Sequence, residues 1–120
     1  PGECPDAVCE TPLGRLAQRR ITDSASTAEP QGTLARIAAG YRPGDTDFAW
    51  TRLTLWRTQL AAALDQPPYD PITRVQVSGA PDSPSTALLA AWLGLRLQVL
   101  VEVDVADGNP SSGIHRVVLH

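Results

Sequence analysis

The order of three segments in the second half of the chain restricts the fold more than any other feature of the sequence. Residues 72–78 (ITRVQVS) lie between a proline and a glycine and carry apolar residues broadly at strand spacing. Ser83 and Pro84 then supply an N-cap and a first-turn proline for a helix. Residues 99–105 (VLVEVDV) are rich in β-branched side chains and predict a second strand. Because a strand–helix–strand order usually joins two parallel strands by a right-handed crossover, the sequence predicts an α/β fold built on a βαβ unit.

A third strand is predicted close to the end of the chain. The turn-forming run DGNP (residues 107–110) precedes residues 114–119 (IHRVVL), which again have strand character. The short separation predicts that residues 99–105 and 114–119 pair with each other as a hairpin. We therefore expect a layered α/β sandwich whose mixed, mostly parallel sheet has an antiparallel strand at one edge.

Two helices are expected in the middle of the chain. Residues 33–41 predict a short helix with one apolar face. Residues 48–64 contain no glycine or proline and place apolar side chains at helical spacing, so they predict one continuous helix. Asp45 or Thr46 is expected to cap this helix, with Asp47 favoured near the positive end of the helix dipole.

The N-terminal third of the sequence is less regular. Residues 1–13 contain three prolines and one glycine and are predicted to form an irregular entry segment. Residues 14–25 fit either a helix or a strand that ends at a polar loop. The 120 residues suit a single α/β domain or part of one. There is no methionine, and the chain starts at Pro1 without a signal-like segment, so we expect a piece of a longer, cytoplasmic protein.

Charge and hydropathy argue against two classes of partner. The net charge is −3, and all 10 basic residues are arginines. A nucleic-acid-binding domain usually carries a basic excess, so no nucleic acid is expected as a partner. No apolar run approaches the roughly 18–20 residues that a membrane helix requires, so no membrane partner is expected either.

Few patterns of catalytic chemistry are present. The sequence has no glycine-rich nucleotide loop, no lysine for a phosphate loop and no H-E-x-x-H motif. Asp45 and Asp47 would suit acid–base chemistry or Mg²⁺, but two aspartates at a helix start also suit a cap. Cys4 and Cys9 are interpreted as two plain thiols, with a disulfide, a redox pair or a metal site as alternatives. We therefore expect no catalytic residue, no metal and no cofactor.

One helical segment has the composition of a protein interface. Residues 47–57 contain one phenylalanine, two tryptophans and two arginines. Trp50 and Arg57 lie seven residues apart and share a face of the predicted helix, and these two residue types are enriched at interface hot spots. The alternative is that Trp56 belongs to the core, Trp50 is half-buried and the arginines extend over the surface.

Four segments, which together cover much of the chain, resemble a known family. The run YRPGDTDFAWTRLTLWR (residues 41–57) is similar to the signature of the glucose-6-phosphate dehydrogenase assembly proteins, the OpcA family. Three more runs are similar to segments of that family in the same order: PLGRLAQRRITDSA (residues 12–25), SPSTALLAAWLGLRL (residues 83–97) and GIHRVVL (residues 113–119). Members of the family are longer than this chain on both sides, as expected for a fragment.

The sequence departs from the family signature at one position, Leu55, where a proline is expected. A proline there would begin a helical turn after Thr54, whereas leucine allows the helix to begin near Asp47. The resemblance therefore leaves two possible starts for this helix.

The resemblance implies a function and a partner. The family is implied to bind glucose-6-phosphate dehydrogenase, to promote its oligomeric assembly or activation, and so to regulate entry into the oxidative pentose phosphate pathway without catalysis of its own. We expect the contact surface to comprise Asp45, Asp47, Trp50, Arg52 and Arg57, with Arg19, Arg20 and Asp23 as a second, weaker patch.

Two other hypotheses remain open at this point. In the first, the chain is an enzyme or a small-molecule-binding domain. A sugar phosphate or nucleotide would then lie at the carboxyl ends of the parallel strands, near Ser78, Gly79 and Asp104. In the second, the domain is purely structural, and the partner-binding face lies in flanking sequence.

Overall fold

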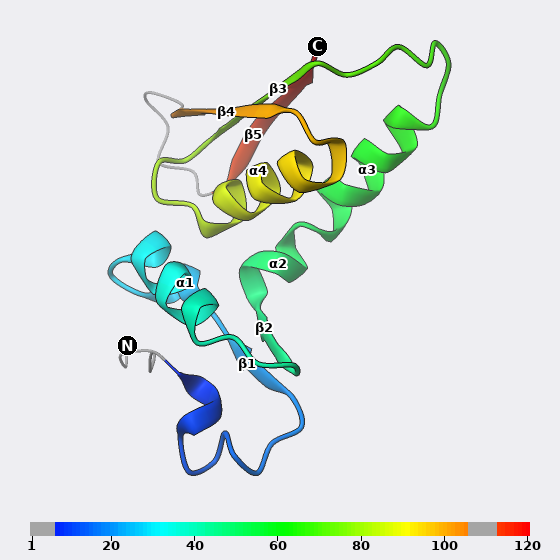
Figure 1. Cartoon of the computed structure of the whole chain (residues 1–120). Helices are drawn as coiled ribbons and strands as arrows, with labels where there is room; N and C mark the ends of the chain where they lie inside the picture. The colour runs from blue at the N-terminus through cyan, green and yellow to red at the C-terminus, as the bar shows by residue number, and fades with distance from the viewer. Residues whose placement is uncertain (1–6, 106–112) are drawn as a thin grey trace.

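Two separate sheets lie toward opposite ends of an elongated molecule, with helices between them (Figure 1). The computed structural model describes residues 7–105 and 113–120, and the molecule measures 52 × 33 × 21 Å. The N-terminal lobe contains a two-stranded sheet and α1 (Pro30–Ala39), and the C-terminal lobe contains a three-stranded sheet and α4 (Pro84–Leu97). The α/β class predicted from the sequence is confirmed.

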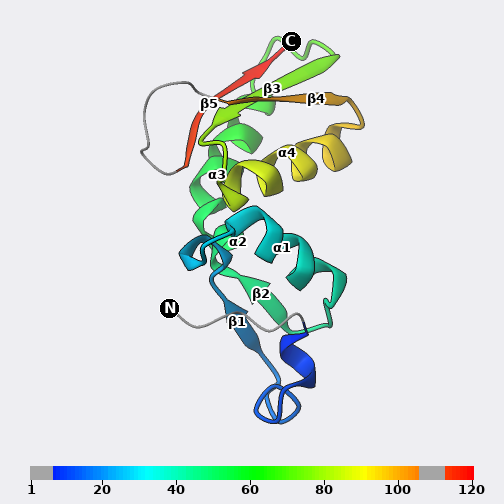
Figure 2. The ribbon, with the colours of Figure 1, turned by 90° about the vertical axis from the view of Figure 1, so that its left-hand side faces the viewer.

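The predicted βαβ unit forms the C-terminal lobe. Strands β3 (Arg74–Gly79) and β4 (Leu100–Val105) are parallel, in a register that runs from Arg74 beside Leu100 to Gly79 beside Val105. The crossover helix α4 begins as predicted, because the Ser83 hydroxyl accepts a hydrogen bond from the Thr86 amide and Pro84 occupies the first turn. It packs along one face of the sheet (Figure 2).

The predicted hairpin between the last two strands is wrong. Strand β5 (Ile114–Leu119) pairs antiparallel with β3 rather than with β4, so the strand order is β4-β3-β5. In this position Val117 lies beside Val77 and Leu119 beside Val75, and both β5 side chains pack against the hydrophobic core. Pairing with β4 would have added β5 at the far edge of β4, away from this core. The antiparallel strand still lies at an edge of a mixed sheet, as expected.

The N-terminal lobe contains a second parallel pair that the sequence did not reveal. Strands β1 (Arg20–Thr22) and β2 (Asp45–Asp47) are joined through η2 (Ser24–Ser26) and α1, and a further short helix, η1 (Val8–Glu10), precedes them. The strand interpretation of residues 14–25 is therefore correct for their last part. Helix α1 begins three residues before the predicted start, because Pro30 has the backbone geometry of a first helical turn.

The helix predicted over residues 48–64 is divided at Leu53 into α2 (Phe48–Arg52) and α3 (Thr54–Leu64). The Leu53 amide donates to the Trp50 carbonyl at 3.2 Å, a tight i to i−3 bond that ends α2. The turn directs the Leu53 side chain, which is fully buried, into the core. A new helix thus begins at Thr54 although Leu55 stands where the family signature has proline.

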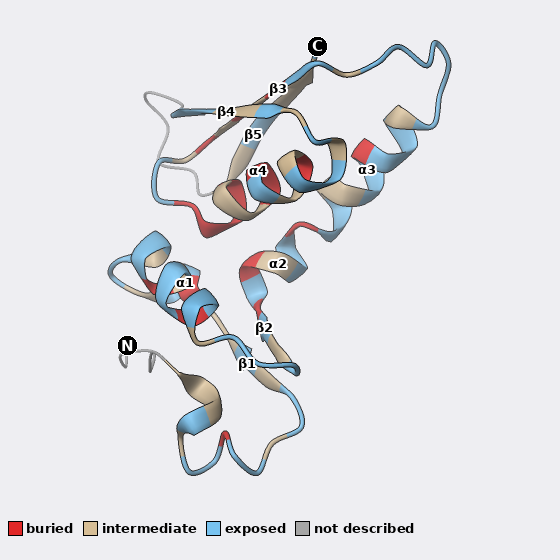
Figure 3. Ribbon diagram, viewed as in Figure 1, coloured by how far each residue is buried: buried red, intermediate tan, exposed pale blue. Residues whose placement is uncertain are grey.

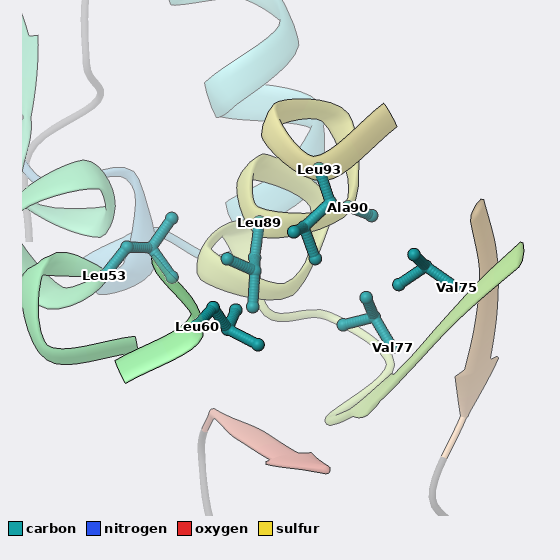
Figure 4. Packing of buried hydrophobic residues seen from close by; sticks show 7 residues of the cluster. All are labelled: Leu53, Leu60, Val75, Val77, Leu89, Ala90 and Leu93. Atoms are coloured by element: carbon teal, nitrogen blue, oxygen red, sulfur yellow. The ribbon is translucent and has the colours of Figure 1, made fainter. Parts of the chain in front are cut away.

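The core lies where α3 and α4 meet the inner face of the three-stranded sheet (Figure 4). Its buried members are Leu53, Leu60, Val75, Val77, Leu89, Ala90 and Leu93. Figure 3 shows that α4 contains buried residues at its start and along its length, whereas much of α3 and β4 is exposed. Within residues 7–105 and 113–120, no helix is long and apolar enough to cross a bilayer.

Candidate functional site

Asp47 lies at the junction of β2 and α2 and is enclosed by four hydrogen-bond donors. Its Oδ2 accepts from the Thr22 hydroxyl at 2.6 Å and from the Ser24 amide at 2.9 Å. Its Oδ1 accepts from the Ser24 hydroxyl and from the Ala49 amide, both at 2.9 Å. The side chain therefore caps α2 and ties the end of β1 to that helix. The predicted caps, Asp45 and Thr46, are thus replaced by Asp47, which is 6% exposed.

Arg20 and Asp45 lie side by side on the two strands of the N-terminal sheet. The Arg20 Nε donates to one carboxylate oxygen of Asp45, and the Arg42 amide donates to the other at 2.7 Å. The remaining Arg20 donors bind three backbone carbonyls, those of Gly14, Ala17 and Pro43. Burial alone would raise the pKa of the Asp45 carboxyl, but the hydrogen bonds and charges of Arg20 and Arg42 bring that pKa below its usual value.

A second ion pair joins α2 to the segment that follows β1. Arg52 donates from both terminal nitrogens to the two carboxylate oxygens of Asp23, at 2.8 and 2.9 Å. The Arg52 guanidinium also lies 5.9 Å from the centre of the Phe48 ring. The hydrogen bond from Arg52 lowers the pKa of Asp23, and the same bond raises the pKa of Arg52. This pair is more exposed than Arg20–Asp45, with side chains 49% and 30% exposed.

Replacing Asp23 with asparagine is expected to lower the free energy of unfolding by about 0.2–1 kcal/mol at neutral pH, as for other exposed ion pairs. Because the folded pKa of Asp23 lies below its unfolded value, the carboxylate contributes fully above the unfolded pKa of about 3.9. That contribution is lost as pH falls through the folded pKa. Urea unfolding from neutral pH to about pH 2.5 should therefore show the two proteins converging in stability.

Asp82→Asn, at an exposed aspartate near the same surface, serves as the control for this change. It should leave the stability at neutral pH nearly unchanged. A difference between wild type and Asp23→Asn that stays constant down to the lowest pH would show that the ion pair is not its source.

The Trp50 and Arg57 side chains meet across the break between α2 and α3. The Arg57 guanidinium carbon lies 4.0 Å from the centre of the Trp50 ring, a close cation–π contact. Trp50 is half-buried and packs against the core, as does Trp56. Arg57 donates to the Thr54 hydroxyl at 3.3 Å, whereas its Nε is buried and has no acceptor among the described residues.

The two patches expected from the sequence are interleaved in the structure. Arg20 and Asp23 of the weaker patch form ion pairs with Asp45 and Arg52 of the main patch, respectively. Arg19 is exposed, and Asp47 is enclosed. Of the eight candidate residues, Trp50 and Arg57 contact each other, and neither forms an ion pair with another of the eight.

Sequence reasoning missed the residues that position α2. Thr22 and Ser24 bind Asp47 across more than twenty residues of sequence, and Ser85 donates from its hydroxyl to the Ala49 carbonyl at 3.2 Å. The only local signal was the run of polar residues after β1, which indicated a loop but not a partner.

An open cleft of about 600 Å³ lies between the two lobes, just beyond the carboxyl end of β3. Its lining comes from η2, α2, the start of β5 and the loop and first turn of α4: Asp23, Ala25, Ser26, Arg52, Ala80, Pro81, Asp82, Ser83, Pro84, Ser85 and Gly113. Among the described residues of this lining the only cation is Arg52, which is already paired with Asp23. The cleft is therefore close to the strand ends predicted as a ligand site, although Ser78, Gly79 and Asp104 do not line it.

No group of three or more potential ligand side chains in the described ranges is arranged to hold a metal ion. The Cys9 sulfur lies 3.9 Å from the Gly40 carbonyl oxygen, and Cys4 lies outside the described residues. The predicted roles of Cys4 and Cys9 as a pair therefore fall outside the described residues.

A comparison with known proteins identifies the family. The matching family model describes the C-terminal domain of the glucose-6-phosphate dehydrogenase subunit, and it covers residues 43–120, well over half of the chain. The match includes β2, the Trp50–Arg57 contact and the whole C-terminal lobe. Comparisons with curated proteins and with solved structures found no match. The chain therefore belongs to the OpcA family, through its match to the C-terminal domain of that family.

Proposed function

We propose that this chain is a non-catalytic factor that binds glucose-6-phosphate dehydrogenase in the cytoplasm and promotes its oligomeric assembly or activation. It would thereby regulate entry into the oxidative pentose phosphate pathway. The family match supports an association with this dehydrogenase. The observation that carries the binding role is the Trp50–Arg57 pair, in which an arginine without a carboxylate partner in the described residues is held on an aromatic ring.

A binding role fits the state of the other candidate residues better than catalysis does. The carboxylates of Asp45 and Asp47 are enclosed by donors from their own lobe and by the start of α2. A general acid or base needs a carboxyl group that a substrate can reach. We therefore propose that Asp45, Asp47 and Arg20 support the surface from within.

The proposed contact surface has a centre and a rim. Trp50 and Arg57 form its centre, because tryptophan and arginine contribute most to interfaces when packed. Arg52, Asp23 and Arg19 lie outside this centre and are proposed to adjust the rate of association through their charge.

The proposed mechanism is a shift in population. If the factor binds the assembled dehydrogenase more tightly than the dissociated form, mass action moves the enzyme toward assembly. The size of the shift equals the difference in binding free energy between the two forms. No chemical step by this chain is required.

Alanine at Trp50 or at Arg57 is expected to weaken binding to the dehydrogenase by at least about tenfold without unfolding the domain. The measurement is capture of the purified dehydrogenase from the same organism by the chain, followed by the dehydrogenase activity of the complex. Leu95→Ala on α4, where the side chain is 76% exposed, is the matched control and should bind normally. Normal binding by both variants would move the interface away from α2 and α3.

A second candidate function is suggested by the cleft beyond β3. Its volume of about 600 Å³ is within the range of small-molecule sites. Its lining carries two aspartates and one arginine that is already paired, which disfavours anions such as a sugar phosphate or nucleotide. A rise in melting temperature with glucose 6-phosphate or NADP would favour this candidate over a binding role alone.

A further inference from the structure

Arg57 differs from Arg20, Arg52 and Arg74, each of which has a carboxylate partner. Arg20 is paired with Asp45, and Arg52 with Asp23. Arg74 lies 3.7 Å from a Glu102 carboxylate oxygen. Arg57 is also fixed, by the Trp50 ring, but no carboxylate of the described residues pairs with it. A guanidinium that is immobilised and has no carboxylate partner can donate hydrogen bonds to an external carboxylate.

The surroundings of Arg57 determine how such a group would approach. Its Nε is buried and has no acceptor in the part of the chain that the structure describes, so the edge formed by Nε is closed to an external group. The terminal nitrogen that donates to the Thr54 hydroxyl does so at an exposed position. A carboxylate can therefore reach Arg57 only at the end of the guanidinium, where the two terminal nitrogens form a fork.

The helix surface around Arg57 also permits close approach. Thr54 and Ala61 lie one turn before and one turn after Arg57 on α3, and Thr58 follows it directly; all three are exposed and small. The Thr58 hydroxyl is already committed, because it donates to the Thr54 carbonyl at 2.9 Å. Arg57 is therefore the charged donor on this part of α3.

We infer that Arg57 is the receptor for a single aspartate or glutamate side chain on the surface of the partner protein. The carboxylate binds end-on to the two terminal nitrogens of Arg57, while the Trp50 ring covers one face of the guanidinium and excludes water from it. Charge complementarity selects this occupant, since the described residues around Arg57 offer a cation and neutral groups. The inference rests on the proposed function and specifies the chemistry that the dehydrogenase must supply.

The test uses the full chain and the purified dehydrogenase, with binding measured by calorimetry at low and at high ionic strength. Arg57→Lys keeps the charge but loses the planar fork, and Arg57→Gln loses both. We expect the lysine variant to bind at least about tenfold more weakly and the glutamine variant to lose at least as much. Arg96→Gln, at an exposed arginine in the last turn of α4, is the matched control and should remain within about twofold of wild type.

Exchanging the charges of Arg57 and its partner separates a binding role from a purely structural role, because a structural role of Arg57 would not be restored by a change in the dehydrogenase. Arg57→Glu should abolish binding, and arginine substitutions at surface acids of the dehydrogenase should restore it at one position only. Thermal unfolding of each variant establishes that it is folded, and Arg57→Lys and Arg57→Gln decide the question if Arg57→Glu does not fold.

The possible outcomes separate the inference from the proposed function. If wild type binds and the lysine and glutamine variants bind equally well, the carboxylate receptor is wrong and the assembly role stands. If lysine substitutes fully but glutamine does not, a point charge suffices and the end-on fork is overturned. If wild type itself does not bind the dehydrogenase, the proposed function and the inference fail together.

Discussion

Replacing Asp47 with alanine is expected to lower the free energy of unfolding by about 3–5 kcal/mol, because the change removes one acceptor group from four donors. Two of the donors are the backbone amides of Ser24 and Ala49, which cannot rotate to another partner. The other two are the hydroxyls of Thr22 and Ser24. The loss combines a missing helix cap with three buried donors, the Ser24 amide, the Ser24 hydroxyl and the Ala49 amide, that would be left without their acceptor.

Urea unfolding measures this change, and two further variants define its origin. Asp47→Asn keeps the side-chain shape but presents an amide group to the donors, so the free energy of unfolding should fall by about 2 kcal/mol. Thr46→Ala, at the exposed neighbour, should cost no more than about 0.5 kcal/mol. An Asp47→Ala protein within about 1 kcal/mol of wild type would show that the four hydrogen bonds are replaced by other contacts.

Replacing Leu53 with alanine is expected to lower the free energy of unfolding by about 2–5 kcal/mol, the range for a fully buried leucine. The side chain is 0% exposed and joins α2 to the core between α3 and α4. Removing this side chain leaves a cavity at the break between α2 and α3. The backbone there is held by the tight Leu53–Trp50 hydrogen bond and is poorly placed to collapse around the cavity.

The chain contains a matched control for this second substitution. Leu55 lies two residues further along and is 66% exposed, so Leu55→Ala should change the stability by less than about 0.5 kcal/mol. Denaturant midpoints of the two variants, at equal m-values, provide the comparison. Equal stability of Leu53→Ala and Leu55→Ala would show that Leu53 is not the residue that anchors the break.

Both substitutions bear on the proposed contact surface. Helix α2 is only five residues long, and an isolated helix of this length is not stable in water. Asp47 holds its first turn, and Leu53 holds its end. The position of Trp50, and with it the stack beneath Arg57, therefore depends on two residues that need not touch a partner.

Short-range chemistry controls the features that could be predicted from the sequence. Ser83 and Pro84 specify the start of α4, and alternating valines specify β3. Because a strand–helix–strand order leaves few topologies, the parallel pairing of β3 and β4 also followed. Trp50 and Arg57 could be paired in advance because helical spacing brings them to one face, and the stack survives the break at Leu53.

Other features depend on distant segments and became visible only in the folded chain. The division of residues 48–64 at Leu53 follows from the need to bury that side chain, and no glycine or proline marks it. Strand β5 joins β3 because its apolar residues meet the core there, although sequence proximity favoured β4. The pairs Arg20–Asp45 and Asp23–Arg52 join residues 25 and 29 positions apart. Their partners are selected by the packing of β1, β2 and α2, which local sequence patterns do not encode.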